Sequence, residues 1–219
     1  NTGFVKAYVG GINYKYFKYD HVKVGKRQVG STFKPFLYAL AMQEGYSPCY
    51  EIPNVPVVFE KNQWGLPDKN WVPRNSDDKY EGILMSLRFG LANSINTVTA
   101  YIMKQFGPHS VLDLAKKMGI TSNLEPVPSI CLGTFDLSVY EMVGAYSTFV
   151  NKGIWIEPLI VSRIENKNGV LLQDFNPKIL EPILKKVEPH STALKKSPDI
   201  PKLNSFKPSL LFNFWISKK

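Results

Sequence analysis

The stretch Arg27-Gln28-Val29-Gly30-Ser31-Thr32-Phe33-Lys34-Pro35-Phe36 decides how the chain around it folds. From position 33 onward, apolar side chains fall at 33, 36, 37, 40 and 41, a spacing that predicts one buried face of a helix. Pro35 suits the first turn, where its missing N–H would be unpaired in any case. Gly45 suits a left-handed cap at the C-terminal end. We therefore expect a helix that begins near Ser31 and ends before Gly45.

Ser31 and Lys34 lie on the same side of this predicted helix because they are one turn apart. The N-terminal end of a helix presents free N–H groups and a partial positive charge, which favour negative charge developing near Ser31. A serine hydroxyl is a poor nucleophile until a neighbouring base takes its proton. A lysine whose pKa is lowered by burial or by another cation can be that base. The pair therefore predicts a serine nucleophile activated by a lysine.

The pattern Ser-x-x-Lys alone carries little information, because it is usually a surface serine and lysine. It recurs at Ser76 and Lys79, in a polar stretch that we interpret as a solvated loop. The residues around Ser31 make the first occurrence specific. The string resembles the active-site helix of class A penicillin-binding proteins, the bifunctional cell-wall synthases, which usually read Arg-Gln-Pro-Gly-Ser-x-Phe-Lys-Pro. Val29 in place of the proline is the one departure.

A second motif is the tripeptide Ser94-Ile95-Asn96. Its ordinary interpretation is an N-cap for the helix that follows. At a junction between two predicted helices, it also resembles the second motif of penicillin-binding proteins. The resemblance implies that Ser94 relays a proton to the leaving group and that Asn96 binds the substrate's amide. Both interpretations stay open, since a capping side chain can also face a cleft. The stretch 71–75 likewise resembles a Trp-x-Pro-x-Asn that precedes this motif in the family.

The rest of the chain predicts an α+β fold. Hydrophobic spacing and caps predict helices at 82–93, 96–106, 108–119 and 138–151, after a long irregular excursion at 46–82. In the last helix, Ser138 and Glu141 form a capping box, and Val139, Met142, Val143 and Phe149 are expected to face inward. Strands are expected at 3–9, 154–164 and 170–175, with a turn at 166–169. This order resembles a partial penicillin-binding/β-lactamase-like transpeptidase fold, with a helical cluster packed on an incomplete antiparallel sheet.

The family's third motif, Lys-Thr-Gly or Lys-Ser-Gly, does not occur in the sequence. Lys167-Asn168-Gly169 comes too early and falls in the predicted turn. We therefore expect residues 1–175 to be the N-terminal part of a transpeptidase domain, truncated before its third motif. We expect residues 176–219 to be a basic, poorly structured tail without resemblance to the family, since they hold nine lysines against three acids. Whether this tail is genuine or follows a frame change stays open.

Composition excludes several other classes of function. The net charge of +9 lies mostly in the tail, and the body shows no basic face interleaved with aromatic residues, so we expect no nucleic-acid partner. Cys49 and Cys131 stand in unrelated contexts, and we expect neither a metal site nor a cofactor. No apolar run approaches the roughly 20 residues of a membrane span. We therefore expect any membrane attachment to come from an N-terminal anchor outside this sequence.

The resemblance implies a serine-type D-Ala-D-Ala transpeptidase that cross-links peptidoglycan. Ser31 would attack the stem peptide, Lys34 would be the base, and β-lactam antibiotics would acylate the same serine. Such a protein would work in the periplasm, or on the extracytoplasmic face of the bacterial inner membrane. A β-lactamase shares the first two motifs, but Arg27, Gln28 and the stretch 71–75 favour the synthase. The alternative is an inactive penicillin-binding fragment, because the missing third motif supplies carboxylate binding and part of the oxyanion hole. We expect the activity of this chain to be impaired.

Overall fold

The structure, a computed structural model, describes residues 2–184 of the 219-residue chain. These residues divide into two units. The first comprises residues 2–27, 115–122 and 137–184, and the second comprises residues 28–114 and 123–136. Within residues 2–184, no helix combines the length and the apolar character that a membrane crossing needs.

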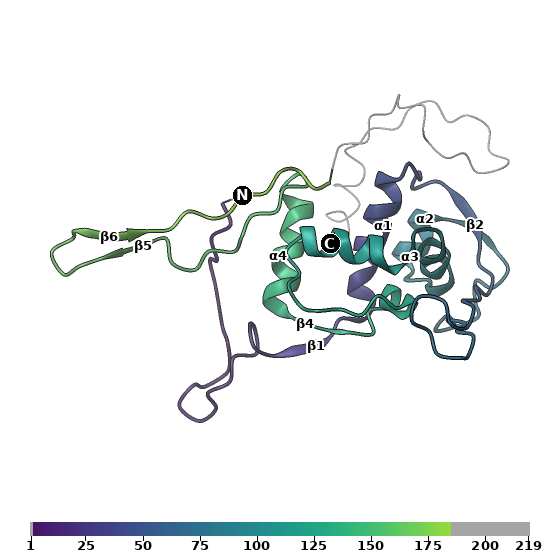
Figure 1. Cartoon of the computed structure of the whole chain (residues 1–219), viewed down its shortest axis with the longest axis horizontal. Coiled ribbons are helices and arrows are strands. Elements are labelled where there is room, and N and C mark those ends of the chain that lie inside the picture. The colour runs from purple at the N-terminus through teal and green to yellow at the C-terminus, as the bar shows by residue number, and fades with distance from the viewer. Residues whose placement is uncertain (1, 185–219) are drawn as a thin grey trace. The chain divides into compact units, whose positions relative to one another are not determined.

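The second unit is built around α1 (Lys34–Gln43), which follows the 3-10 helix η1 (Gly30–Phe33) (Figure 1). Seven of the ten residues of α1 are buried, so the helix is enclosed on most of its surface. Pro35 lies in its first turn, and Gly45 after its end has a φ of 86°. The helix predicted from the opening stretch is therefore confirmed.

The other elements of this unit are α2 (Leu87–Ala92), most of α3 (Asn96–Lys117), η2 (Pro128–Leu132) and the antiparallel pair β2 (Glu51–Pro53) and β3 (Leu84–Ser86). The prediction of one helix over 82–93 is wrong in its first half. Residues 84–86 pair with β2, and α2 begins only after Ser86, whose side chain accepts a hydrogen bond from the Phe89 N–H. Gly107, with φ 72° and ψ 164°, interrupts α3 and confirms the predicted break between two helices.

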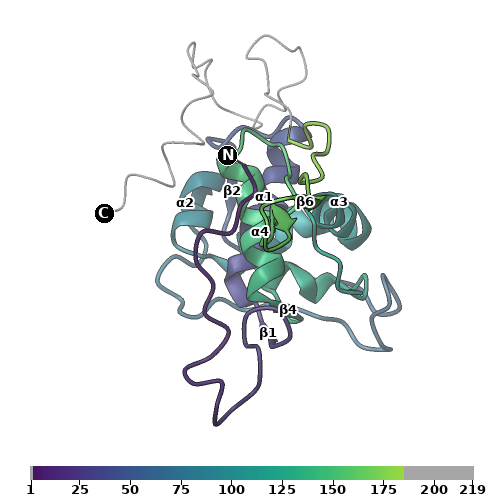
Figure 2. The ribbon, with the colours of Figure 1, turned by 90° about the vertical axis from the view of Figure 1, so that its left-hand side faces the viewer.

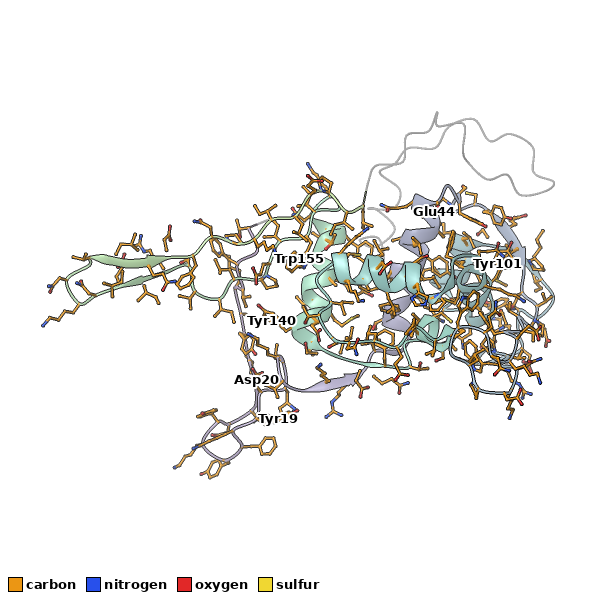
Figure 3. All side chains as sticks on the ribbon, viewed as in Figure 1. Tyr19, Asp20, Glu44, Tyr101, Tyr140 and Trp155 are labelled. Carbon is orange, nitrogen blue, oxygen red and sulfur yellow. The ribbon has the colours of Figure 1, made fainter. Side chains whose placement is uncertain are left out.

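The first unit contains α4 (Val139–Val150), which begins with the predicted capping box of Ser138 and Glu141. The prediction that Val139 and Val143 face inward is wrong, because they are 53% and 60% exposed. The buried residues of this helix are Glu141, Gly144, Ala145 and Thr148. Gly144 lies against Pro158, whose Cγ would be 3.2 Å from an added Cβ. Tyr140 lies on the same helix (Figure 3), and its hydroxyl donates a hydrogen bond of 2.8 Å to the Pro158 carbonyl. Two residues of α4, Tyr140 and Gly144, thus contact Pro158.

Strands are shorter than the sequence predicted. β5 (Arg163–Glu165) and β6 (Leu171–Asp174) form a hairpin across the predicted turn, and it extends from α4 in the plane of Figure 1 and toward the viewer in Figure 2. All its strand residues are exposed. The strands predicted at 3–9 and in most of 154–164 are wrong. Only the bridges Phe4–Leu159 and Ile156–Ile179 form there, because an alternating sequence becomes a strand only beside a paired neighbour.

The third pair consists of β1 (Lys26–Gln28) and β4 (Asp136–Ser138). The boundary between the two units falls within both strands, after Arg27 and after Asp136. The strands of the described chain thus form three two-stranded sheets. The expected α+β class, helices with small antiparallel sheets, is confirmed.

The start of the predicted tail, residues 176–184, belongs to the first unit and makes backbone hydrogen bonds within it. Leu180 donates a backbone hydrogen bond of 3.2 Å to Trp155, and Ile183 donates one of 2.7 Å to Gly153. None of residues 176–184 is buried, so poor packing from residue 176 onward stays a prediction. The rest of the predicted tail lies outside the described residues.

Candidate active site

Lys34, the first residue of α1, is the centre of the candidate site. Its side chain is only 1% exposed. Its Nζ donates hydrogen bonds to the Ser94 carbonyl at 2.7 Å, to Ser94 Oγ at 3.0 Å and to Asn96 Oδ1 at 2.6 Å. These bonds use all three protons of an ammonium group. The structure thus brings the lysine of the first motif against both polar residues of the second.

The charged form of Lys34 is disfavoured where it lies. Burial lowers the pKa of Lys34 to about 8, against an ordinary value of 10.5, because the ammonium loses most of its hydration. A cation at the N-terminal end of a helix also meets the positive end of the helix dipole. A neutral amine is therefore accessible near neutral pH. It carries a lone pair that can accept a proton from a hydroxyl.

Ser31 lies one turn before Lys34 in η1 and is exposed. Within residues 2–184, its hydroxyl has no hydrogen-bond partner. Its backbone is fixed from both sides, because Lys34 donates its N–H to the Ser31 carbonyl and Gly30 donates its N–H to the Gly133 carbonyl at 2.9 Å. Gly133 approaches Gly30 so closely that a side chain at 133 would collide with the Gly30 backbone. The serine is thus held at a fixed place in the chain with its hydroxyl open to solvent.

Ser94 occupies the turn between α2 and α3 in a left-handed conformation, with a φ of 55°. Residues other than glycine adopt this conformation at a cost, and they keep it only where surrounding contacts hold them. Here the Ser94 N–H donates to the Leu91 carbonyl, and both side-chain and backbone oxygens of Ser94 accept from Lys34. The side chain of Ser94 therefore faces the lysine.

The N-cap of α3 comes from Asn75 and not from Ser94. Asn75 Oδ1 accepts the backbone N–H of Asn96 at 2.8 Å and that of Thr97 at 3.1 Å. The capping interpretation of the Ser-x-Asn tripeptide is therefore wrong for Ser94. The side chain of Asn96 is also oriented, since its Nδ2 donates to the Arg74 carbonyl at 2.8 Å while its Oδ1 accepts from Lys34.

Sequence reasoning missed two buried residues, one that holds Asn75 and one beside the lysine. Asn54, 1% exposed, accepts a hydrogen bond of 2.9 Å from Asn75 and donates one to the Tyr80 carbonyl. Cys131, on η2, is fully buried, and burial raises the pKa of its thiol to about 12. The thiol is therefore neutral and adds no charge beside Lys34. Neither Asn54 nor Cys131 stands in a motif, so the sequence offered no signal for them. Asn75 differs, because it belongs to the Trp-x-Pro-x-Asn stretch at 71–75.

No group of three or more His, Cys, Asp or Glu side chains comes together among residues 2–184, so this part of the chain offers no obvious ligand set for a metal. The polar atoms around Lys34 are hydroxyl, amide and carbonyl groups. Such groups suit proton transfer and hydrogen bonding to a peptide-like substrate.

The fold is that of penicillin-binding transpeptidase domains. The family model described as penicillin binding protein transpeptidase domain matches residues 13–202, and the chain belongs to this family. The match runs into the segment 176–219, for which the sequence predicted no resemblance. That residues 176–219 form a tail separate from the transpeptidase domain remains a prediction.

Proteins with similar sequences and structures support this family assignment. Penicillin-binding protein 1A of Aquifex aeolicus is 33% identical over 187 residues, which are 85% of this chain and 25% of the relative. The crystal structure of penicillin-binding protein 1A from Haemophilus influenzae superposes with a TM-score of 0.69 at 32% identity, covering 78% of this chain and 25% of that one. PonA1 of Mycobacterium tuberculosis in complex with penicillin V gives 0.62 at 25% identity, covering 75% and 45%. The chain thus spans about a quarter of the length of the 1A proteins it matches.

Proposed function

We propose that this chain belongs to a serine-type transpeptidase in which Ser31 forms an acyl-enzyme with the D-Ala-D-Ala end of a peptidoglycan stem peptide. The observation that carries the proposal is the environment of Lys34. It is a buried lysine, with its pKa lowered to about 8, one turn after an exposed serine in a helix of this family. β-Lactam antibiotics would acylate the same serine, as the complex of PonA1 with penicillin V suggests by analogy.

In the proposed reaction, neutral Lys34 accepts the proton of the Ser31 hydroxyl as Oγ attacks the carbonyl carbon of the penultimate D-Ala. The C–N bond to the terminal D-Ala then breaks, and its nitrogen takes up a proton. Ser94 suits this relay because its Oγ accepts from Lys34, which leaves its own O–H free to donate. An amine of a stem peptide on a neighbouring peptidoglycan strand then attacks the acyl-enzyme ester and releases Ser31. Asn96 would bind the substrate's amide.

A second candidate function is an inactive penicillin-binding fragment. The absence of a Lys-Thr-Gly or Lys-Ser-Gly tripeptide from the sequence favours it. Removing one oxyanion-hole donor typically slows acyl transfer by about a hundred- to a thousandfold. We place the protein in the periplasm or on the extracytoplasmic face of the inner membrane, as its resemblance to class A penicillin-binding proteins implies.

Labelling with a fluorescent penicillin tests the proposal. Covalent, stoichiometric labelling that Ser31→Ala abolishes and Lys34→Ala slows severely is the result expected of an active serine enzyme. Ser76→Ala is the matched control, since it removes the exposed serine of the other Ser-x-x-Lys match. Absent labelling, or labelling slower by several orders of magnitude, would support the inactive fragment. Labelling that survives Ser31→Ala would overturn the assignment of the nucleophile. Rapid loss of the label by hydrolysis would indicate a β-lactamase.

A further inference from the structure

The side chain of Asn75 lies in the irregular excursion 46–82 but caps a helix that begins 21 residues later. The first backbone N–H groups of a helix have no partner within the helix, and an amide oxygen can satisfy them. Asn75 Oδ1 does this for two of them, at Asn96 and Thr97. An N-cap is usually the residue next to the helix, so a cap supplied from a distant loop ties the two segments together.

The neighbouring residue fixes the side chain of Asn96. The Arg74 carbonyl accepts from Asn96 Nδ2 at 2.8 Å, which turns the amide oxygen of Asn96 toward Lys34 Nζ. Two consecutive loop residues therefore hold both the backbone and the side chain of Asn96.

Asn75 is itself anchored. Its Nδ2 donates to Asn54 Oδ1 at 2.9 Å, and that same oxygen accepts the hydroxyl of Thr97. Asn54 is buried, and its backbone N–H and carbonyl pair with Ile83 and Gly82. A buried amide with every group engaged has a single orientation, since any rotation would leave a polar atom unpaired. The orientation of Asn75 is thus set by a cluster that does not touch Lys34.

We infer that Asn75 is a positioning residue for the Lys34 site: it holds the first turn of α3 so that Ser94 and Asn96 keep their contacts with the lysine. The strained backbone of Ser94 makes such support necessary. Without Asn75, the first turn of α3 would fray and water would reach Lys34. Because burial is what lowers the pKa of Lys34, that pKa would return toward 10.5. Only the expected effect on acylation rests on the proposed function; the effect on Lys34 follows from these contacts.

The first experiment compares the pKa of Lys34 in Asn75→Ala and in Asn70→Ala. Asn70 lies in the same excursion, is exposed and accepts one hydrogen bond from the Lys61 N–H, so it is a matched control. Protein labelled with 13C at the lysine ε-carbon is titrated by NMR, and the Lys34 signal is assigned by its loss in Lys34→Arg. The pKa should rise by at least one unit in Asn75→Ala and stay near 8 in Asn70→Ala. An equal pKa in both variants would overturn the inference.

Hydrogen exchange separates positioning from general stability. In Asn75→Ala, the amides of Asn96 and Thr97 should exchange at least tenfold faster while those of α1 keep their protection. Asn75→Asp should restore protection, because its carboxylate can accept the same two N–H groups, although it loses the donations to Asn54 and Thr97. A uniform loss of protection through α1 would show a merely structural role and overturn the inference. Should Asn75→Ala not fold, Asn75→Ser, polar but too short to reach both amides, carries the same test.

Acylation links this inference to the proposed function. If the unaltered chain is labelled by penicillin, Asn75→Ala should slow the acylation step by about 10- to 100-fold with little change in initial binding, as expected of a misplaced base. Slower labelling caused by weaker binding alone would contradict positioning. If the unaltered chain is not labelled but the pKa of Lys34 still rises in Asn75→Ala, the proposed function fails and the positioning role stands.

Discussion

Lys34 in the second unit and Glu141 in the first are both charged residues buried near the start of a helix. They are 1% and 9% exposed. Each is surrounded by hydrogen-bonding groups, three oxygens around Lys34 and the N–H and O–H groups of Thr121, Ser122 and Ser138 around Glu141. Each also has a pKa below its ordinary value. Their roles are nevertheless opposite.

A lowered pKa favours the charged form of an acid but disfavours the charged form of a base. Burial raises the pKa of Glu141, but hydrogen bonds from Ser122 and Ser138 outweigh it and lower the pKa to about 2. The carboxylate also lies at the positive end of α4, where an anion is stabilised. For Lys34, burial dominates and the cation lies at the unfavourable end of α1. The comparison therefore distinguishes a structural charge, which keeps its ionised state, from one prepared to lose its proton.

The largest expected effect follows replacement of the reactive charge. Lys34→Met should slow penicillin acylation by about a thousandfold or more, because the proposed base is lost. The free energy of unfolding should change by less than about 1 kcal/mol, since an apolar chain of similar length avoids burying a cation. Labelling kinetics and urea unfolding measure the two quantities. A large loss of stability with little loss of labelling would reverse the roles assigned to Lys34 and Glu141.

Removing the structural charge should act on stability. Glu141→Ala should lower the free energy of unfolding by about 3 kcal/mol, because it leaves buried donors on Ser122 and Ser138 without an acceptor and breaks the capping box. Urea unfolding measures the loss, and Glu141→Gln, which keeps one acceptor oxygen, should lose less. A loss below about 1 kcal/mol in Glu141→Ala would show that the carboxylate is not the anchor described here.

The pH dependence of stability should show two separate windows. Glu141 has a lower pKa in the folded chain, so its stabilisation is complete above its ordinary value of 4.5 and is lost as the pH falls toward 2. For Lys34, the unfolded chain binds more protons between pH 8 and 10.5, so stability should rise across that window. Each change should be about 1 to 3 kcal/mol. Urea midpoints should lose the acid window in Glu141→Gln and the alkaline window in Lys34→Met; a window that persists contradicts its assignment.

The smallest effect concerns the exposed face of α4. Val143→Thr should change the free energy of unfolding by no more than about 0.5 kcal/mol, because Val143 is already 60% exposed. Ala145→Val, on the buried face of the same helix, should destabilise by about 1 to 3 kcal/mol through overpacking. Thermal unfolding of the pair provides the test. A larger loss for Val143→Thr would mean that the sequence-based prediction of an inward Val143 was sound.

The features that could be predicted from the sequence are those that depend on residues close together in the chain. The helix after Ser31, the break at Gly107 and the capping box at Ser138 each depend on residues within about one turn, and all three predictions are confirmed. The residues Ser31, Lys34, Ser94 and Asn96 were nominated by motif, and their catalytic roles stay predictions.

Tertiary structure decided the rest. The strand predicted at 3–9 failed because strand pairing depends on a neighbour far away in the sequence. The buried face of α4 carries Gly144 against Pro158, a contact that hydrophobic spacing does not predict. The cap of α3 came from Asn75 in a loop without regular structure. Lys34 shows most clearly the difference between what the sequence determines and what the tertiary structure decides. Its place on the helix follows from adjacent residues, but its lowered pKa requires burial and partners 60 residues away, because desolvation is a property of the folded surroundings and not of the lysine.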